Sequence, residues 1–353
     1  MSVRDVSDPA RLTHGGDIYR NDVRLDFSVN LNPMPAPASL AEAIRRGAEA
    51  AGCYPDPLQS ALRREVAALD GVAPGQVLCG NGASELLMAA VHALRPKEVL
   101  LTAPCYAGYR IALQAADPVL SEYPLDESKA FSLDEGILDE ITGQTDLLIL
   151  TDPNNPDGKR IDPELLRRIV RRCEELDVRL LLDECFLPLS EGPGYQRLFP
   201  GVLHLRAFTK TFAVPGVRIG YLVCSEEDCL VQIRRHLPEW NVSVIADAAG
   251  REASRILRET DYLKRSAAMI REERAWLAAE LTRLGAKVYP GEANYLLLRG
   301  GKSWYGKLLA RGILLRDCSD YHGLGAGFYR VAVRAHEENR ELISALKKIQ
   351  EEE

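Results

Sequence analysis

The chain has 353 residues, a length that predicts about two domains and allows a substantial core. Hydrophobic residues make up 46% and charged residues 27%, which is typical of a folded globular protein and disfavours a disordered one. The 44 Lys and Arg against 51 Asp and Glu give a formal net charge of −7, and no long block of like charge occurs. This balance disfavours nucleic-acid binding through a basic surface.

The distribution of apolar residues predicts a soluble, cytoplasmic protein. The first residues lack the apolar core of a signal peptide, and no apolar run approaches the ~18 residues that a membrane span needs. The eight cysteines are scattered and include no Cys-x-x-Cys pair. We therefore expect reduced, buried thiols rather than disulfides or a zinc site.

Strand-like apolar runs alternate with amphipathic helices along the chain, which predicts an α/β fold with a mostly parallel sheet. Helices are expected over 39–51 and 57–69, from the turn 80–82 through 94, from 104 onward and over 163–176, and strands over 98–102, 146–150, 178–183, 202–206 and 217–224. Helices over 226–284, broken at Pro238, lead to short strands over 286–289, 295–299, 313–316 and 328–333 and to a helix from 337. We expect a large domain over 34–258 and a small α+β domain made of 1–33 and 259–353.

Lys210 is the most informative single residue. It stands between Phe208 and Phe212, just past a predicted strand, where α/β folds place their active sites. Desolvation there would lower the pKa of the amine and make it a nucleophile for a carbonyl group. A surface lysine beside two aromatic residues has the same local pattern, so the interpretation depends on other residues.

Three other strand ends and turns offer matching chemistry. Asp183 ends an apolar strand, where its carboxylate could hold the protonated pyridine nitrogen of pyridoxal phosphate. Asn155 lies in an Asn-Asn-Pro turn that could aim its amide at a ring hydroxyl. Residues 82–84 open a helix, whose free N–H groups bind phosphate well. Each pattern also has an ordinary structural explanation: a loop carboxylate, a chain reversal, or an N-cap by Ser84.

In chain order, these elements resemble the aspartate-aminotransferase-like superfamily of pyridoxal-phosphate enzymes, fold type I, over nearly the whole chain. The resemblance implies a large domain with a mostly parallel central sheet flanked by helices, a small α+β domain, and pyridoxal 5'-phosphate as the cofactor. It implies that Lys210 binds the cofactor covalently, that Asp183 pairs with its pyridine nitrogen, and that Asn155 bonds its ring hydroxyl. Further cofactor contacts implied in the same way are Gly82, Ala83, Ser84, Thr209 and Arg218 at the phosphate and Tyr106 against the ring.

The resemblance also implies an oligomeric state, and at three positions this chain departs from the usual residues of the superfamily. Tyr54 matches a tyrosine that reaches the cofactor phosphate of a neighbouring subunit, which implies a homodimer. Phe186 stands where many aminotransferases have a tyrosine that donates to the ring hydroxyl. Ala207 replaces a hydroxyl residue that often touches the phosphate, and Asp157 replaces the Thr or Ser of the Asn-Pro turn.

The last predicted strand carries candidates for substrate binding. Alternation places Arg330 and Arg334 on one face, and Arg316 ends another strand. Guanidinium groups suit an anionic substrate because each offers a fork of donors to carboxylate or phosphate, although one arginine of such a pair is often a surface residue. His14 begins a His-Gly-Gly turn that could bind an anion, and Asn30 and Asn32 follow it.

Within the superfamily the resemblance is narrower, to the threonine-phosphate decarboxylase subfamily, which is related to histidinol-phosphate aminotransferases. It implies that Arg330 binds the substrate α-carboxylate and that Arg316, Arg334, His14 and Asn32 surround the substrate phosphate. Asp320 stands where the subfamily usually has Asn. The implied reaction is decarboxylation of L-threonine O-3-phosphate to 1-amino-2-propanol O-2-phosphate in cobalamin biosynthesis. An aminotransferase is the alternative, and a non-catalytic binding module of the same fold is a remote one.

Overall fold

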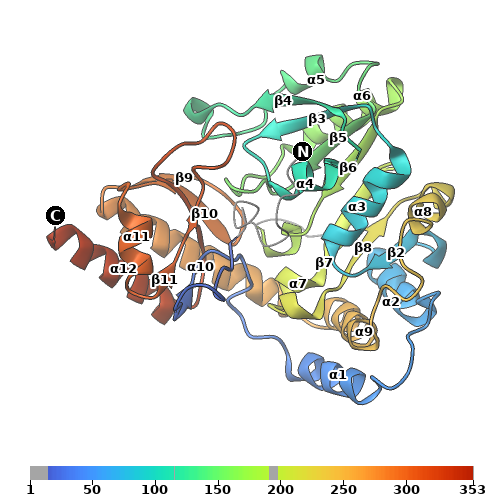
Figure 1. The fold of residues 1–353 in the computed structure, drawn as a ribbon, viewed down its shortest axis with the longest axis horizontal. Coiled ribbons are helices and arrows are strands. Elements are labelled where there is room, and N and C mark those ends of the chain that lie inside the picture. Colours follow the sequence, from blue (N-terminus) through green and yellow to red (C-terminus); the bar gives the residue numbers. More distant parts are fainter. Residues whose placement is uncertain (1–14, 115, 191–197, 353) are drawn as a thin grey trace, which may run out of the picture.

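A seven-stranded sheet forms the larger part of the protein in the computed structural model, which describes residues 15–114, 116–190 and 198–352 (Figure 1). In spatial order the strands run β2-β8-β7-β6-β5-β3-β4. Their bounds are β2 (Val77–Gly80), β3 (Glu98–Ala103), β4 (Val119–Pro124), β5 (Leu147–Thr151), β6 (Arg179–Asp183), β7 (Leu203–Ala207) and β8 (Gly220–Val223). The neighbours from β7 to β4 are parallel, whereas β8 is antiparallel to both β7 and β2.

Helices cover both faces of this sheet (Figure 1), which explains why the central strand β5 has four apolar residues in succession. Alternate residues of β5 belong to different cores: Leu147 and Ile149 pack under α3, α4 and α8, and Leu148 and Leu150 pack under α6. A strand buried on both faces needs apolar side chains at every position. The helices on this part of the chain are α1 (Ala38–Glu49), α2 (Ser60–Asp70), α3 (Ala83–Leu94), α4 (Gly108–Leu113), α5 (Ile137–Glu140), α6 (Pro163–Glu175), α7 (Phe208–Thr211), α8 (Glu227–Arg234) and α9 (Val244–Glu259).

A second, antiparallel sheet lies to one side, at the left of Figure 1. Its strand order is β12-β13-β10-β9, with β9 (Lys287–Tyr289), β10 (Tyr295–Arg299), β12 (Arg316–Asp317) and β13 (Phe328–Ala332). The long helix α10 (Tyr262–Arg283), α11 (Trp304–Leu309) and α12 (His336–Glu351) accompany it. None of the described helices is long and apolar enough to cross a membrane.

The segment before α1 packs on this second sheet. Strand β1 (Leu25–Asp26) pairs in parallel with β11 (Ile313–Leu314), and Phe27 is fully buried in the core formed by α10, α12 and the small sheet. Sequences from both ends of the described chain therefore build one core. The domain bounds at 33/34 and 258/259 stay a prediction.

Several elements differ from the expectation. Strands β1, β2 and β4 were not predicted: β1 and β2 are short, and β4 is an edge strand in which four of the six residues are exposed. The second helix begins at Ser60 rather than 57, because the Asp56 carboxylate accepts the N–H groups of Leu58 (2.9 Å) and Ser60 (2.7 Å) and forms a turn there. The helical region after 226 is three helices, and its last break falls between Glu259 and Tyr262.

Candidate active site

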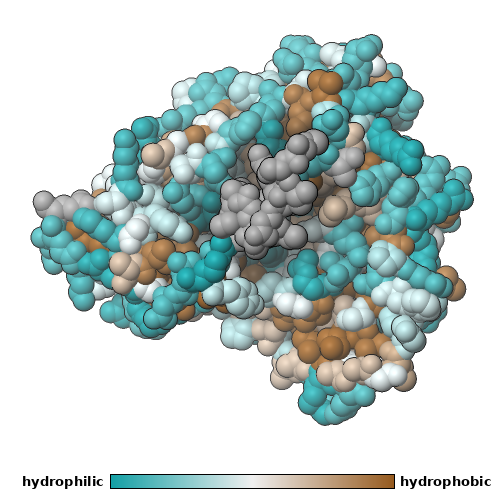
Figure 2. Space-filling view, viewed as in Figure 1, coloured by the Kyte–Doolittle hydropathy of each residue, from teal (hydrophilic) through white to brown (hydrophobic). Residues whose placement is uncertain are grey.

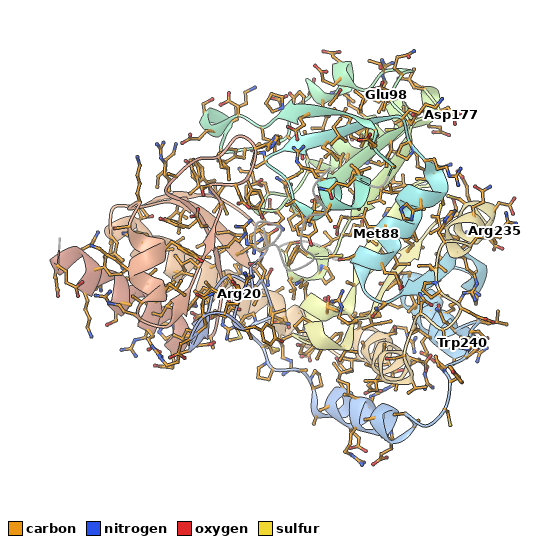
Figure 3. All side chains as sticks on the ribbon, in the orientation of Figure 1. Arg20, Met88, Glu98, Asp177, Arg235 and Trp240 are labelled. Carbon is orange, nitrogen blue, oxygen red and sulfur yellow. The ribbon has the colours of Figure 1, made fainter. Side chains whose placement is uncertain are left out.

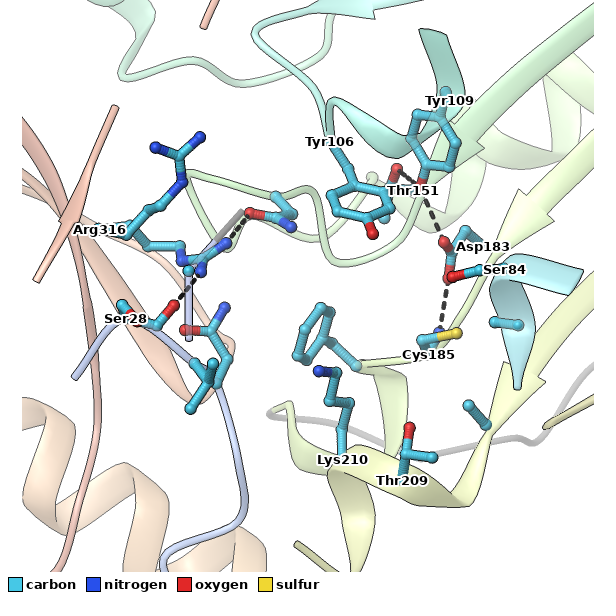
Figure 4. Close-up of a pocket in the computed structure, with 18 of the residues that line it drawn as sticks. Ser28, Ser84, Tyr106, Tyr109, Thr151, Asp183, Cys185, Thr209, Lys210 and Arg316 are labelled. Carbon is cyan, nitrogen blue, oxygen red and sulfur yellow. Dashed lines mark hydrogen bonds between the residues drawn. The ribbon is translucent and has the colours of Figure 1, made fainter. Parts of the chain in front are cut away.

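A cavity of about 230 Å³ lies where the carboxyl ends of the main strands face the small sheet (Figure 4). Open α/β sheets bind ligands at this edge. The structure brings the following predicted residues to its wall: Ala83, Ser84, Tyr106, Asn155, Asp183, Thr209, Lys210, Arg218, Arg316 and Arg330. Residues of the main sheet, the small sheet and the segment before α1 thus meet at one site.

Lys210 projects from α7 into this cavity (Figure 4). Strand β7 ends at Ala207, and the buried rings of Phe208 and Phe212 anchor the turn in the core, with Phe208 5.2 Å from the ring of Tyr221. Burial lowers the pKa of the Lys210 amine from 10.5 to about 8, and the positive charge of Arg330 adds to the effect. Near pH 7 about a tenth of this amine is therefore uncharged, far more than at its ordinary pKa, and only the uncharged form is a nucleophile.

Asp183, the last residue of β6, is buried and held by two donors. It accepts hydrogen bonds from the Tyr109 hydroxyl (2.8 Å) and the Cys185 N–H (2.9 Å). Tyr109 is 2.6 Å from the Thr151 hydroxyl, so its orientation is fixed in turn. Burial raises the pKa of the Asp183 carboxyl because the charged form is desolvated. A cationic nitrogen beside it would offset that cost.

Tyr109 is a functional candidate that the sequence analysis missed. It is 1% exposed, follows Tyr106 by three residues and touches its ring edge-on at 5.4 Å. This spacing fits any helix with an apolar face, so the pattern indicates a core residue. Only its hydrogen bond to Asp183 in the folded structure distinguishes Tyr109 from an ordinary core residue.

The start of α3 has the features of a turn that could hold an anion. Gly82, the N-cap, has φ +83° and no side chain to bond the first N–H groups of the helix. A Cβ at Gly82 would lie 2.4 Å from a guanidinium nitrogen of Arg218, which shows how closely that guanidinium covers the turn. A Cβ at Gly220 would likewise lie 2.7 Å from the N–H nitrogen of Ala83. Free N–H groups, the helix dipole and an arginine together suit a phosphate.

Arg316 and Arg330 face each other across two antiparallel strands, β12 and β13, where they form a register pair. Directly opposed residues point to the same side of a sheet, which brings both guanidinium groups to the cavity. Arg330 donates to the Asn155 side-chain oxygen (2.7 Å) and the Ser28 carbonyl (2.6 Å). Arg316 donates through one nitrogen to both carboxylate oxygens of Asp320, at 2.9 and 2.8 Å.

The prediction that Asn32 binds the substrate phosphate is wrong, because Asn32 does not line the cavity. Its buried amide donates to the Thr211 carbonyl (2.8 Å) and to the Ser266 hydroxyl (2.9 Å), and its oxygen accepts from the Met34 N–H (3.0 Å). Asn30 lines the cavity instead. Asn30 is 2% exposed, and neither polar atom of its side chain has a partner among the described residues.

The prediction that Arg334 lies beside Arg330 at the substrate phosphate is also wrong. Strand β13 ends at Ala332, so the alternation that placed Arg334 on the face of Arg330 does not continue. Its guanidinium pairs with Glu338 one helical turn later, and Arg334 does not line the cavity. His14 lies outside the described residues. Tyr54 is 81% exposed and its ring is tilted against that of Trp240, with ring centroids 4.9 Å apart, so its role in a neighbouring subunit stays a prediction.

The cavity residues match the parts of pyridoxal phosphate one by one. The turn at the start of α3 suits its phosphate, the buried Asp183 suits its pyridine nitrogen, and the amine of Lys210, with its lowered pKa, suits its aldehyde. This donor set on a mostly parallel sheet defines a pyridoxal-phosphate enzyme of fold type I.

The chain belongs to the aminotransferase class I and II family, whose pattern matches residues 23–349. It is 33% identical to a threonine-phosphate decarboxylase of Salmonella typhimurium, over 95% of this chain and 96% of that one. It is 31% identical to a histidinol-phosphate aminotransferase of Anaeromyxobacter sp., over 89% and 87%. The crystal structure of the histidinol-phosphate aminotransferase from Clostridium acetobutylicum superposes with a TM-score of 0.85 at 28% identity, over 93% of this chain and 100% of that one. The predicted fold class and the pyridoxal-phosphate dependence are thereby confirmed.

Proposed function

We propose that this protein decarboxylates a phosphorylated amino acid, L-threonine O-3-phosphate, to 1-amino-2-propanol O-2-phosphate in cobalamin biosynthesis. The observation that carries the proposal is the register pair of Arg316 and Arg330 in one cavity with Lys210. Two guanidinium groups side by side suit a substrate with two anionic groups, here a carboxylate and a phosphate. The 33% identity to a threonine-phosphate decarboxylase over nearly the whole chain supports the choice of reaction.

The geometry of the cavity supports a set of proposed cofactor contacts. Lys210 would hold pyridoxal phosphate covalently through Nζ, and Asp183 would bond its pyridine nitrogen. The Asn155 side-chain oxygen accepts from Arg330, which leaves the amide N–H₂ to reach the ring hydroxyl. Phe186, which also lines the cavity, has no hydroxyl to share that role. The remaining contacts would be Ala83, Ser84, Thr209 and Arg218 at the phosphate, with Gly82 beneath Arg218, and Tyr106 against the ring.

The chain's own residues would orient the substrate and move one proton. When bound, the cofactor accepts the electron pair left at the substrate α-carbon. Arg330 would bind the α-carboxylate and Arg316 the phosphate, with Asn30 beside them in place of Asn32. Orientation by these groups would select the C–CO₂⁻ bond, carbon dioxide would leave, and Lys210 Nζ or water would return a proton to the α-carbon. If the same groups selected the C–H bond instead, Lys210 would move that proton and the outcome would be transamination.

A histidinol-phosphate-type aminotransferase is the second candidate, favoured by the 31% identical relative and the crystal structure with a TM-score of 0.85. One experiment separates the two. The holoenzyme is incubated with O-phospho-L-threonine and assayed for carbon dioxide, and separately with histidinol phosphate plus 2-oxoglutarate and assayed for glutamate. Glutamate without carbon dioxide would overturn the decarboxylase. Neither product from either mixture would favour the non-catalytic binding module.

We further propose a homodimer in the cytoplasm, with Tyr54 reaching the cofactor phosphate of a second copy. Tyr54 and Trp240 form an exposed aromatic pair, and Trp240 lies at the outer edge of the molecule, away from the small sheet (Figure 3). Tyr54 also borders a groove between α1 and α9, lined on its sides by Arg46 and Arg251. Hydrophobic residues gather on the surface near these helices (Figure 2). Large exposed rings beside an apolar surface favour a protein contact.

Tyr109→Phe is expected to leave the Asp183 carboxylate less firmly positioned. The change removes the hydroxyl that donates to the carboxylate at 2.8 Å, a bond to a charged group that contributes about 1.5–3 kcal/mol. We expect kcat/KM, measured by a product assay, to fall about tenfold, and the dissociation constant of the cofactor, measured by titration of the visible band, to rise. Tyr123→Phe, which removes a hydroxyl–carboxylate bond to Asp134, is the matched control. Equal behaviour of the two variants would exclude a positioning role for Tyr109.

Cofactor attachment to the cofactor-free protein is expected to depend on pH. Only the uncharged amine of Lys210 can attack an aldehyde, and its pKa of about 8 means that this form increases as pH rises through 8. The rate at which the visible band grows after pyridoxal phosphate is added should therefore rise with pH and reach half its maximum near pH 8. A half-rise near pH 10.5 would show that the cavity does not perturb this lysine.

A further inference from the structure

The two cavity arginines differ in their charge partners. Arg330 donates to two neutral oxygens, and no carboxylate pairs with it among residues 15–114, 116–190 and 198–352. Arg316 is held by Asp320, whose two oxygens lie 2.9 and 2.8 Å from one guanidinium nitrogen. Arg316 lines the cavity (Figure 4). Asp320 is not among the residues of the cavity wall. The carboxylate that holds Arg316 is thus outside the cavity wall.

The Asp320 contact uses donors that an anionic ligand would need. A guanidinium binds phosphate best through two parallel N–H bonds. One terminal nitrogen of Arg316 is bonded to Asp320 and the other to the Asp317 carbonyl. The Arg316 side chain is 10% exposed and that of Asp320 is 36% exposed, so water screens this pair only in part.

The Asp320 charge acts more strongly on a doubly charged ligand than on a singly charged one. Coulomb repulsion scales with the product of the charges, so a phosphate dianion is opposed about twice as strongly as a carboxylate in the same place. Asp320 also cancels much of the attraction that Arg316 would exert on either ligand. The net preference of the cavity for phosphate is therefore smaller than two free arginines would give.

We propose that Asp320 is a specificity-determining residue that holds Arg316 and limits the affinity of the cavity for a dianionic phosphate group. The inference rests on the proposed function in placing the substrate phosphate at Arg316. If so, one side chain outside the cavity wall determines how strongly the protein prefers a ligand with a phosphate group to one with a carboxylate in its place.

The test compares two ligands of matched skeleton on the holoenzyme, 3-phosphonopropionate and succinate. Neither has an amine, so neither can displace Lys210 from the cofactor. Their dissociation constants are measured by calorimetry at pH 8.5, where the phosphonate is doubly charged. In Asp320→Asn, we expect the constant for 3-phosphonopropionate to fall about tenfold and that for succinate about threefold or less.

Asp317→Asn is the matched control. It removes the same charge three residues away, from a carboxylate that accepts the Ser319 N–H at 2.9 Å rather than a guanidinium. Both constants should stay within about twofold of the wild-type values. Asp320→Ser, a smaller neutral change, should reproduce the ratio found for Asp320→Asn if that variant folds poorly.

Equal changes for the two ligands, or no change in either, would overturn the role of Asp320. The proposed function is judged separately by carbon dioxide release from O-phospho-L-threonine in the wild-type protein. Release of carbon dioxide with an unchanged ligand ratio in Asp320→Asn would reject the specificity role alone. A shifted ratio without carbon dioxide or glutamate would reject the proposed reaction and leave the dianion subsite in place.

Discussion

Lys210→Ala is expected to abolish the visible absorption band of the bound cofactor and to lower kcat/KM about 10⁴-fold. The change removes the amine that lies in the cavity with a pKa of about 8, and alanine can neither form a covalent bond to the cofactor nor carry a proton to the substrate. Absorption spectra of the purified protein and a discontinuous product assay measure the two effects.

Lys264→Ala is the control for that prediction. Lys264 is an exposed lysine on α10, so its loss should leave the band and kcat/KM unchanged. Persistence of the visible band in Lys210→Ala would show that another lysine binds the cofactor. Loss of the band with full activity would separate catalysis from the cofactor altogether.

The strand-end residues of the site could be predicted because their positions depend on local sequence. Asp183 ends a strand with three successive leucines, and Lys210 follows a strand in which leucines alternate with His204 and Arg206. Both strands are long enough to be recognised in the sequence. Parallel neighbours bring their carboxyl ends to one edge, so the order of the motifs along the chain already places them together. The same logic works for the helix start at residues 82–84.

The site residues that were predicted wrongly lie in or next to irregular backbone, where no periodic pattern gives the direction of a side chain. Asn30 and Asn32 are two residues apart in a segment with little regular structure, and both are buried. Which of them faces the cavity is decided by the contacts of Asn32 with Thr211 and Ser266, more than 170 residues away. Arg334 was assigned by strand alternation, a rule that fails once β13 ends at Ala332.

The local charge of the site follows from these placements. The protein is acidic overall, yet Lys210, Arg218, Arg316 and Arg330 converge on one cavity. Arg334, which the sequence analysis placed with them, pairs with Glu338 instead. Within the cavity wall Asp183 supplies the opposing charge, at the end nearest the start of α3 (Figure 4). The proposed anionic substrate and the ring nitrogen of the cofactor would thus find complementary charge on opposite sides of the same cavity.

Asp183→Asn is expected to lower kcat about 10²- to 10³-fold while the visible band persists. An amide is nearly the same size as the carboxylate and can still accept one of the bonds from Tyr109 and Cys185, so the fold around it should be kept. It cannot stabilise a positive charge on the pyridine nitrogen. Losing one partner of a buried charge pair costs about 3–5 kcal/mol, enough for this fall in rate.

A matched control lies at the other end of the same strand. Asp177 precedes β6, is exposed and has φ +56°, a conformation that asparagine tolerates well (Figure 3). Asp177→Asn makes the same change in charge and should leave kcat within about twofold of the wild-type value. An unchanged kcat in Asp183→Asn would contradict the role of this carboxylate at the ring nitrogen, whereas loss of the band there would indicate that the variant fails to bind the cofactor. Since the amide cannot keep the pyridine nitrogen protonated, the band of Asp183→Asn should also differ in its pH dependence from that of Asp177→Asn, which a purely structural effect would not cause.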